Sequence, residues 1–441
     1  MVTRTTGLLP VHLSRFFGVK AEEFSAVAWS FVYFFCLLSA YYMLRSVRET
    51  MAIVGGVSNI PWLFTGTFVA MLAATPVFGW VASKFPRKRF LPWVYYFFIV
   101  NILLFFAAFW IADKEYISQV WVGRAFFVWL SVFNLFVVSV FWSFMADIYS
   151  KEQSRRLFGL ISAGGSTGAL IGPLVTSALV VPIGFRNLLP LSAMLLLLAV
   201  YCVYRLRNNA TQQRDPGDRQ SVDSSLPIGG SALAGIRLVA TSRYLGAIAG
   251  ALIIANFLGV AIYMYMAELV KETFDGTDRQ TQVFAILDAA TNTLSFVGQL
   301  LLVRLSVRKL GVGFTLALLP LVSIVGFAVL AVHPVFIVMA TLQVLRRSIT
   351  FGLTKPTTDM LYSVVSPEER YKAKNFVETA IYRGGDLIAT WTIRAISGIG
   401  IAGVAIICVP LAIIWALLAY KIGHEYKRRD IALSMEPTKQ P

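Results

Sequence analysis

Charged side chains are scarce in this sequence. Asp, Glu, Lys and Arg make up only 14% of the 441 residues, whereas they make up about a quarter of a soluble domain. A water-soluble globular domain is therefore excluded, because too few charged residues are present to cover its surface.

Cysteine and histidine are also scarce, with three of each. The cysteines all lie in apolar segments, which excludes a disulfide framework. The histidines stand far apart near the ends of such segments, so no metal-binding cluster is predicted. These residues are Cys36, Cys202, Cys408, His12, His333 and His424. We expect no cofactor and no metal. The spans also show no nucleophile–base pair, so we expect no enzyme activity.

Long apolar runs are abundant, for example "AVAWSFVYFFCLLSAYYML" at 26–44 and "VAIICVPLAIIWALLAY" at 404–420. The runs are continuous rather than alternating, which indicates helices and not a membrane barrel. A helical span needs about 20 apolar residues. We predict an all-α polytopic membrane protein with spans at 24–50, 60–82, 90–112, 118–146, 156–181, 186–206, 243–267, 281–303, 311–332, 335–362, 372–396 and 400–422.

The net charge of +16 comes from clusters of Lys and Arg in alternate loops. This distribution is the positive-inside pattern of a membrane protein, so nucleic acid is not an expected partner. It places both chain ends in the cytoplasm. We expect a bacterial inner-membrane location and contact with membrane lipids.

The chain divides at one polar stretch, "RNNATQQRDPGDRQSVDSSLPIGG" at 207–230, which is typical of a flexible linker. The predicted parts are a cytoplasmic N-terminal segment at 1–23, a six-helix bundle at 24–206, a cytoplasmic linker at 207–242, a second six-helix bundle at 243–422 and a cytoplasmic tail at 423–441. Segment 1–23 fits either a short amphipathic surface helix or a disordered tail.

The two bundles repeat each other in the same direction. "LRSVRETMAIVGG" after the first span resembles "MAELVKETFDG" after the seventh, and "DIYSKEQSRRLF" resembles "DMLYSVVSPEERYKAKNF". Two parallel six-helix pseudo-repeats with a site between them describe a major-facilitator-type transporter of 12 transmembrane helices.

Several charges interrupt the apolar spans, although an arginine at the bilayer centre costs at least about 2.5 kcal/mol. Arg346 and Arg347 are adjacent and point about 100° apart on a helix, so we expect different roles for them. The predicted substrate-binding residues are Arg45, Arg48, Arg346, Arg347, Arg383, Tyr41, Tyr265 and Lys355. The predicted coupling or gating residues are Glu49, Asp147, Glu268, Asp288, Glu378 and Asp386.

Each of these charges could instead form an ion pair that holds two helices in register. Pairing cannot explain all of them, because the basic residues outnumber the nearby acids Glu49, Glu378 and Asp386. Guanidinium groups match carboxylate and phosphate oxygens with two parallel hydrogen bonds. The surplus therefore predicts an anionic small-molecule substrate.

Three motifs resemble the ATP:ADP antiporter, or nucleotide transporter, family. They are "YYMLRSVRET" at 41–50, "FWSFMADIYSKEQSRRLFGLISAGGSTGALIGP" at 141–173 and "SPEERYKAKNFVETAIYRGGD" at 366–386. "LSRFFGVKAEE" at 13–23 resembles the proteobacterial branch. The resemblance implies a major-facilitator-like fold and exchange of nucleotides across the membrane.

The chain departs from that family at several functional positions. Arg48 stands where the exchangers carry a lysine. Asp386 also stands where they carry a lysine. Family glutamates fall near Leu130 and Tyr263, so both acids are absent. Lys374 and Arg383 match. The departures favour a branch that moves a different anion.

The sequence as a whole predicts a monomeric secondary transporter that moves an anionic organic solute by alternating access. A nucleotide exchanged as NTP for NDP is one candidate. The first alternative is a proton-coupled carrier of another anion, such as a carboxylate metabolite or a siderophore. The second is a non-transporting membrane sensor or assembly factor.

Overall fold

The computed structural model describes residues 19–20, 22–84, 87–112, 116–212 and 232–435. All regular structure in these ranges is helical. The main α-helices are α2 (Phe24–Val54), α3 (Ile60–Lys84), α4 (Arg87–Ile111), α5 (Tyr116–Ile148), α6 (Lys151–Ile183), α7 (Leu188–Gln212), α8 (Ala232–Thr241), α9 (Arg243–Thr273), α10 (Thr277–Val297), α11 (Val303–Val332), α12 (Phe336–Ile349), α13 (Lys355–Leu361), α14 (Pro367–Phe376), α15 (Tyr382–Ile396) and α16 (Gly400–Met435).

The described helices include eleven candidate membrane spans by length and hydropathy. The last candidate, 372–435, contains both α15 and α16. Gly400 separates these helices with a positive φ of 72°, a conformation that only glycine adopts easily. The chain is therefore a multi-pass, all-α membrane protein, as its sequence predicts.

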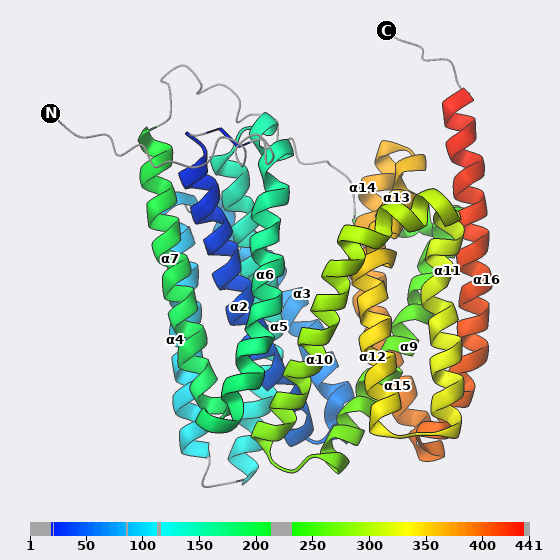
Figure 1. Ribbon diagram of the computed structural model, residues 1–441, viewed down its shortest axis with the longest axis horizontal. Helices are drawn as coiled ribbons and strands as arrows, with labels where there is room; N and C mark the ends of the chain where they lie inside the picture. The colour runs from blue at the N-terminus through cyan, green and yellow to red at the C-terminus, as the bar shows by residue number, and fades with distance from the viewer. Residues whose placement is uncertain (1–18, 21, 85–86, 113–115, 213–231, 436–441) are drawn as a thin grey trace, which may run out of the picture.

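Figure 1 shows the helices in two groups, with α2–α7 on one side and α9–α16 on the other. Helix α2 begins and α16 ends at the same end of the molecule, called the upper end here after its place in the view. Helix α10 leans from the second group toward α6. The division of the chain at 24–206 and 243–422 stays a prediction.

The first group packs tightly because glycines let α6 approach α2. A Cβ atom on Gly168 would overlap the Phe35 carbonyl oxygen, and one on Gly164 would overlap the Phe31 carbonyl oxygen. Close packing replaces the hydrophobic drive that is missing between helices in lipid. Both glycines lie in the "SAGGSTGALIGP" stretch at 162–173.

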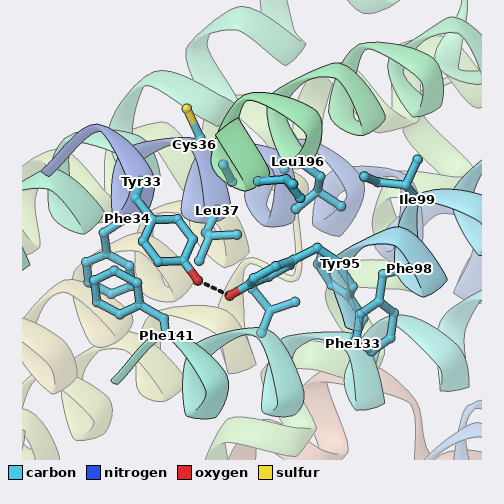
Figure 2. Packing of buried hydrophobic residues seen from close by; sticks show 14 of the residues in the cluster. Tyr33, Phe34, Cys36, Leu37, Tyr95, Phe98, Ile99, Phe133, Phe141 and Leu196 are labelled. Atoms are coloured by element: carbon cyan, nitrogen blue, oxygen red, sulfur yellow. Dashed lines mark hydrogen bonds between the residues drawn. The ribbon is translucent and has the colours of Figure 1, made fainter. Parts of the chain in front are cut away.

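Aromatic side chains fill the interior beside this interface, as Figure 2 shows. The Phe34 and Phe141 rings stack with their centroids 4.1 Å apart. Buried Tyr33 and Tyr95 share a hydrogen bond between their hydroxyls, so two phenol groups are satisfied inside an apolar core. The first group of helices therefore has a closely packed interior.

Three predicted spans are not continuous α-helices. The span at 281–303 has a π-helical turn at Gly298–Leu302. The span at 335–362 has another at Thr350–Thr354, two residues before Pro356. Proline lacks the N–H that would continue the α-helical hydrogen bonds. The span at 372–396 starts earlier, at Pro367, and has a third π-helical turn at Val377–Ile381. Such turns often occur at functional sites.

The segments outside the spans differ in part from the prediction. Helix α7 continues to Gln212, so the start of the predicted flexible linker at 207–230 is helical. Arg, Ala and Gln are good helix formers, which lets the helix extend beyond the apolar residues. The end of the 207–242 linker is also helical, because it includes α8. Residues 1–18 and 213–231 lie outside the described residues.

Candidate functional site

A cavity of about 780 Å³ lies between the two groups of helices. Most of its wall is apolar, with rings from Phe64, Phe127, Phe284 and Trp415. It extends toward the upper end, where Tyr362 contributes to its lining. Six basic and four acidic side chains interrupt this apolar wall, namely Arg45, Arg48, Arg346, Arg347, Lys355, Arg383, Glu49, Asp288, Glu378 and Asp386.

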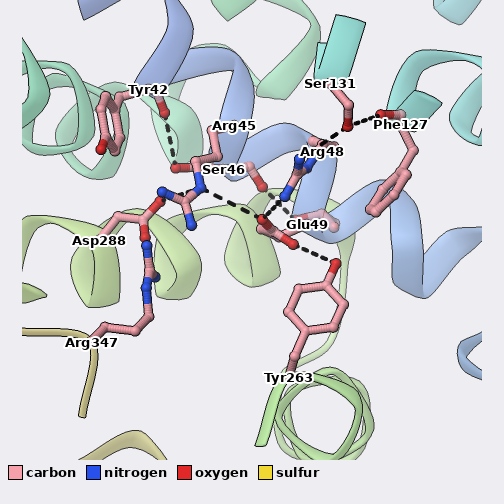
Figure 3. A network of polar contacts seen from close by, with 11 residues as sticks. Tyr42, Arg45, Ser46, Arg48, Glu49, Phe127, Ser131, Tyr263, Asp288 and Arg347 are labelled. Atoms are coloured by element: carbon pink, nitrogen blue, oxygen red, sulfur yellow. Dashed lines mark hydrogen bonds and ion pairs between the residues drawn. The ribbon is translucent and has the colours of Figure 1, made fainter. Parts of the chain in front are cut away.

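Five of these charges form one network that joins α2 to the second group (Figure 3). The Arg48 guanidinium donates to the Glu49 carboxylate at 2.6 Å. The Tyr263 hydroxyl on α9 donates to the other Glu49 oxygen at 2.7 Å. Arg48 also lies 4.8 Å from the centre of the Phe127 ring. Glu49 is therefore held from both groups of helices.

Asp288 on α10 is the second acid of the network. Its carboxylate accepts from Arg347 at 2.6 Å and lies 3.6 Å from the Arg45 Nε atom. The Asp288 side chain is 4% exposed. Burial of a carboxylate is tolerated when cations surround it. Asp288 thus joins α2 to α12 through two arginines from different groups.

Arg346 has a different environment, although it is adjacent to Arg347. It is 9% exposed, and its guanidinium donates to the Ala255 carbonyl of α9. Its carbon centre lies 6.0 Å from the Trp415 ring, and its Nε has no hydrogen-bond partner. No acidic side chain pairs with it among the described residues. The expectation of different roles for the two arginines agrees with these contacts.

Gly259 makes room for Arg346. A Cβ atom at this glycine would lie 2.8 Å from an Arg346 terminal nitrogen. Any larger residue on this turn of α9 would therefore push the guanidinium aside.

Helix α13, the π-helical turn at Val377–Ile381 and α15 supply the other charges of the cavity wall. Lys355 donates to Glu378 at 2.5 Å. Arg383 lies over its neighbour Tyr382, with 5.6 Å between the guanidinium carbon and the ring centre. Among the described residues, neither Arg383 nor Asp386 forms an ion pair. Both line the cavity, and they interact with each other electrostatically at a distance longer than an ion pair.

Four predicted site residues lie outside the cavity lining. Tyr265 is buried at 5% exposure with its hydroxyl unpartnered, because it sits on the opposite face of α9 from Tyr263. Tyr41 packs edge-on against Tyr42. Glu268 lies farther along α9, and Asp147 is exposed near the end of α5. The lining contains none of the four, and their predicted roles in binding and coupling stay predictions.

Tyr263, Asn256 and Trp415 are among the lining residues that were not predicted as site residues. Tyr263 appears in the sequence only as the position of a missing glutamate, yet its hydroxyl binds Glu49. Asn256 donates to the Tyr382 carbonyl at 2.9 Å. Asn256 and Tyr263 are two helical turns apart on α9, which places them on one helix face. This spacing of two polar residues could have identified them as cavity-lining residues from the sequence. Trp415 lies in an apolar run, so the sequence gave no such sign for it.

The two groups of helices close against each other at the lower end. Thr50 and Thr281 share a hydrogen bond of 2.8 Å. The Asp278 carboxylate accepts from the Phe185 backbone N–H at 2.7 Å, and Gln282 donates to the Ser177 carbonyl. The charged cavity therefore lies above a layer of contacts between the two groups.

A family model described as the Major Facilitator Superfamily matches residues 24–390. The chain belongs to this superfamily. The match covers most of the chain, from α2 into α15, and includes all the charged cavity residues. A search of curated protein sequences found no match.

Solved structures support the same fold at low sequence identity. A mutant of the nucleoside transporter NupG is 14% identical, with 91% of this chain and 99% of that chain covered and a TM-score of 0.58. A bacterial homologue of the iron transporter ferroportin, in an inward-facing state, is 13% identical, with 91% and 98% covered and a TM-score of 0.65. A D-xylose–proton symporter is 13% identical, with 92% and 98% covered and a TM-score of 0.61.

These comparisons identify a transporter-type fold of the Major Facilitator Superfamily rather than an enzyme fold. The finer resemblance to the ATP:ADP antiporter family stays a prediction.

Proposed function

We propose that this protein is a secondary transporter that moves an anionic organic solute across a membrane by alternating access. The observation that carries the proposal is a pair of guanidiniums in the cavity wall, Arg346 and Arg383, that form no ion pair among the described residues. Arg346 is buried, and a buried cation without an acid is costly unless a ligand completes it. Arg383 is exposed on the cavity wall. An anionic group between these side chains would supply the missing partner.

Nucleotides are the first substrate class to test. The motifs at 41–50, 141–173 and 366–386 resemble nucleotide exchangers, and one structure of similar fold is a nucleoside transporter. Trp415 and Tyr382 in the cavity wall offer ring faces on which a base could stack. The arginines would then bind the phosphate, while the base contacts the apolar part of the cavity wall.

The mechanism follows from the closed lower end and the cavity above it. The substrate enters from the upper end, which the charge pattern of the loops assigns to the cytoplasm of a bacterial inner membrane. Rocking of the two groups of helices opens the lower end. The ion pairs of Glu49 and Asp288 must rearrange during this step, because they join the two groups.

The test is uptake of radiolabelled ATP, ADP and AMP into proteoliposomes that are empty or preloaded with unlabelled nucleotide. Neutral adenosine is the uncharged control. We expect uptake of at least one anion, with a loss of about tenfold or more in Arg346→Met and Arg383→Met, since hydrogen bonds to charged groups contribute about 1.5–3 kcal/mol. Transport of adenosine alone, or full activity of both variants, would contradict the proposal.

A further inference from the structure

The stretch from α12 into its π-helical turn carries buried polar atoms on the cavity wall. Three of them have no hydrogen-bond partner among the described residues, namely Gln343 Oε1, Arg346 Nε and Thr354 Oγ1. All three side chains line the cavity, and Gln343 and Arg346 are each 9% exposed. We name Gln343, Arg346 and Thr354 the polar row. Most buried polar groups in proteins have a partner, so the polar row points to a ligand.

Helix α9 leaves space in front of the polar row. Ala251, Ala255 and Gly259 line the cavity and lie four residues apart, which places them on one face of α9. This face is turned toward Arg346, because the guanidinium donates to the Ala255 carbonyl and lies 2.8 Å from where a Cβ atom on Gly259 would be. The Trp415 ring of α16 lies 6.0 Å from the guanidinium carbon. Alanine and glycine have no polar side-chain atoms, so a partner for the row has to come from a molecule in the cavity.

The polar row combines three kinds of hydrogen-bonding group. The Arg346 guanidinium only donates, and as a buried cation without an ion pair among the described residues it requires an anion. The Gln343 amide can donate and accept, and so can the Thr354 hydroxyl. A hydroxyl group on the ligand suits both, because it also donates and accepts. The row therefore matches an anion that carries hydroxyl groups.

The spacing of the row sets the size of this ligand. Gln343 lies about one helical turn before Arg346, and Thr354 lies roughly 12 Å after it along the helix axis. The arginine side chain is long, so a molecule of the size of a sugar phosphate can contact Arg346 together with Gln343 or Thr354. Inorganic phosphate would contact Arg346 alone.

We propose that the polar row binds a hydroxylated organic anion, whose anionic group contacts Arg346 and whose hydroxyl groups contact Gln343 and Thr354. This inference rests on the proposed function and names the substrate class of the same cavity. Sugar phosphates belong to this class, and nucleotides belong to it through their ribose. An anion without hydroxyl groups leaves Gln343 and Thr354 unsatisfied, and a site built for a hydroxyl group discriminates against an analogue that lacks it.

The first experiment compares ligands that differ only in their hydroxyl groups. One pair is AMP and its dideoxy analogue, which lacks both ribose hydroxyls. The other pair is glycerol phosphate and propyl phosphate. Dissociation constants are measured by calorimetry with the purified protein in lipid nanodiscs. The hydroxylated member should bind about tenfold more tightly or better, since the analogue leaves buried polar atoms unpaired. Equal affinities within both pairs would overturn the inference and would mean that water satisfies the row.

The second experiment locates the preference with two variants of similar shape. Gln343→Met and Thr354→Val remove polar atoms that have no protein partner among the described residues, so both variants should fold. Each should weaken binding of the hydroxylated member by about threefold to tenfold and leave binding of the hydroxyl-free member unchanged. Thr291→Val is the matched control, because its buried hydroxyl is also unpartnered but does not line the cavity. A hydroxyl preference that persists unchanged in both variants would contradict the assignment to the polar row.

The outcomes separate the two proposals. Uptake of anions without any hydroxyl preference in binding overturns the polar-row proposal and leaves the transport proposal intact. A hydroxyl preference that depends on Gln343 and Thr354, without uptake of any anion into proteoliposomes, supports the polar row and contradicts the transport proposal. No binding of any of these probes by the folded protein overturns the polar-row proposal.

Discussion

The cavity contains two charged regions, which differ in whether their charged side chains form ion pairs. In the network of Arg45, Arg48, Glu49, Asp288 and Arg347, every acid is enclosed by polar partners from both groups of helices. In the wall of α12 and α15, Arg346, Arg383 and Asp386 remain without ion-pair partners among the described residues.

This difference shows that position in the sequence does not decide a role. Arg346 and Arg347 are neighbours, yet one belongs to the wall and the other to the network. The network holds the two groups of helices together, because its ion pairs and hydrogen bonds join them. The wall is the part that a solute can complete.

The largest expected effect is on the network. Asp288→Asn leaves buried Arg347 without its carboxylate and Arg45 with Glu49 alone, which should lower the free energy of unfolding by about 3 kcal/mol. Reversible unfolding in mixed detergent micelles measures this change. Asp386→Asn is the matched control in the wall and should change stability much less. Equal losses in both variants would remove the distinction between the two regions.

The next effect concerns a single hydrogen bond. Tyr263→Phe removes the hydroxyl that donates to Glu49 and should cost about 1.5–3 kcal/mol, since the acceptor is charged. Tyr265→Phe, in the same helix, removes a buried hydroxyl without a partner and should cost nothing. The same unfolding assay compares the two. A larger loss for Tyr265→Phe would contradict the network.

The ion pair between Glu23 and Arg156, outside the cavity, should contribute less to the free energy of unfolding. Burial alone would raise the pKa of Glu23, but hydrogen bonds from Arg156, Gln153 and the Lys20 backbone lower its pKa below the ordinary value. Because Arg156 is partly exposed, Glu23→Gln should cost about 1 kcal/mol or less at neutral pH. A lowered pKa stabilises the fold above the pKa of the unfolded chain, so the difference should vanish as the pH falls below about 4. Unfolding at two pH values checks this sign.

The smallest expected effect is the most decisive for the wall. Arg346→Met removes a buried charge without an acid partner, so stability should stay within about 1 kcal/mol of the wild type or rise. Arg347→Met is the adjacent control and should destabilise, because it takes one cation from Asp288. Comparable destabilisation by both substitutions would mean that Arg346 is structural rather than a binding residue.

Much of the fold and part of the site could be predicted from sequence. The apolar runs predicted the helical membrane class. The charges that interrupt these runs supplied the candidate site residues, and Arg347, Lys355, Glu378 and Asp386 are among those that line the cavity. Tyr265 does not line it, because a tyrosine in an apolar helix carries no sign of which neighbour covers it.

The sequence by itself determined that this chain spans a membrane many times and carries more cations than acids within its spans. The reason is that lipid excludes unpaired backbone groups and penalises charge, so hydropathy alone separates the possible classes of protein. Only the tertiary structure decided which charges pair. Ion pairs depend on short distances between helices that are far apart in the chain. Asp288 on α10 reaches Arg45 on α2, while Asp386 leaves Arg383 unpaired one turn away on the same helix.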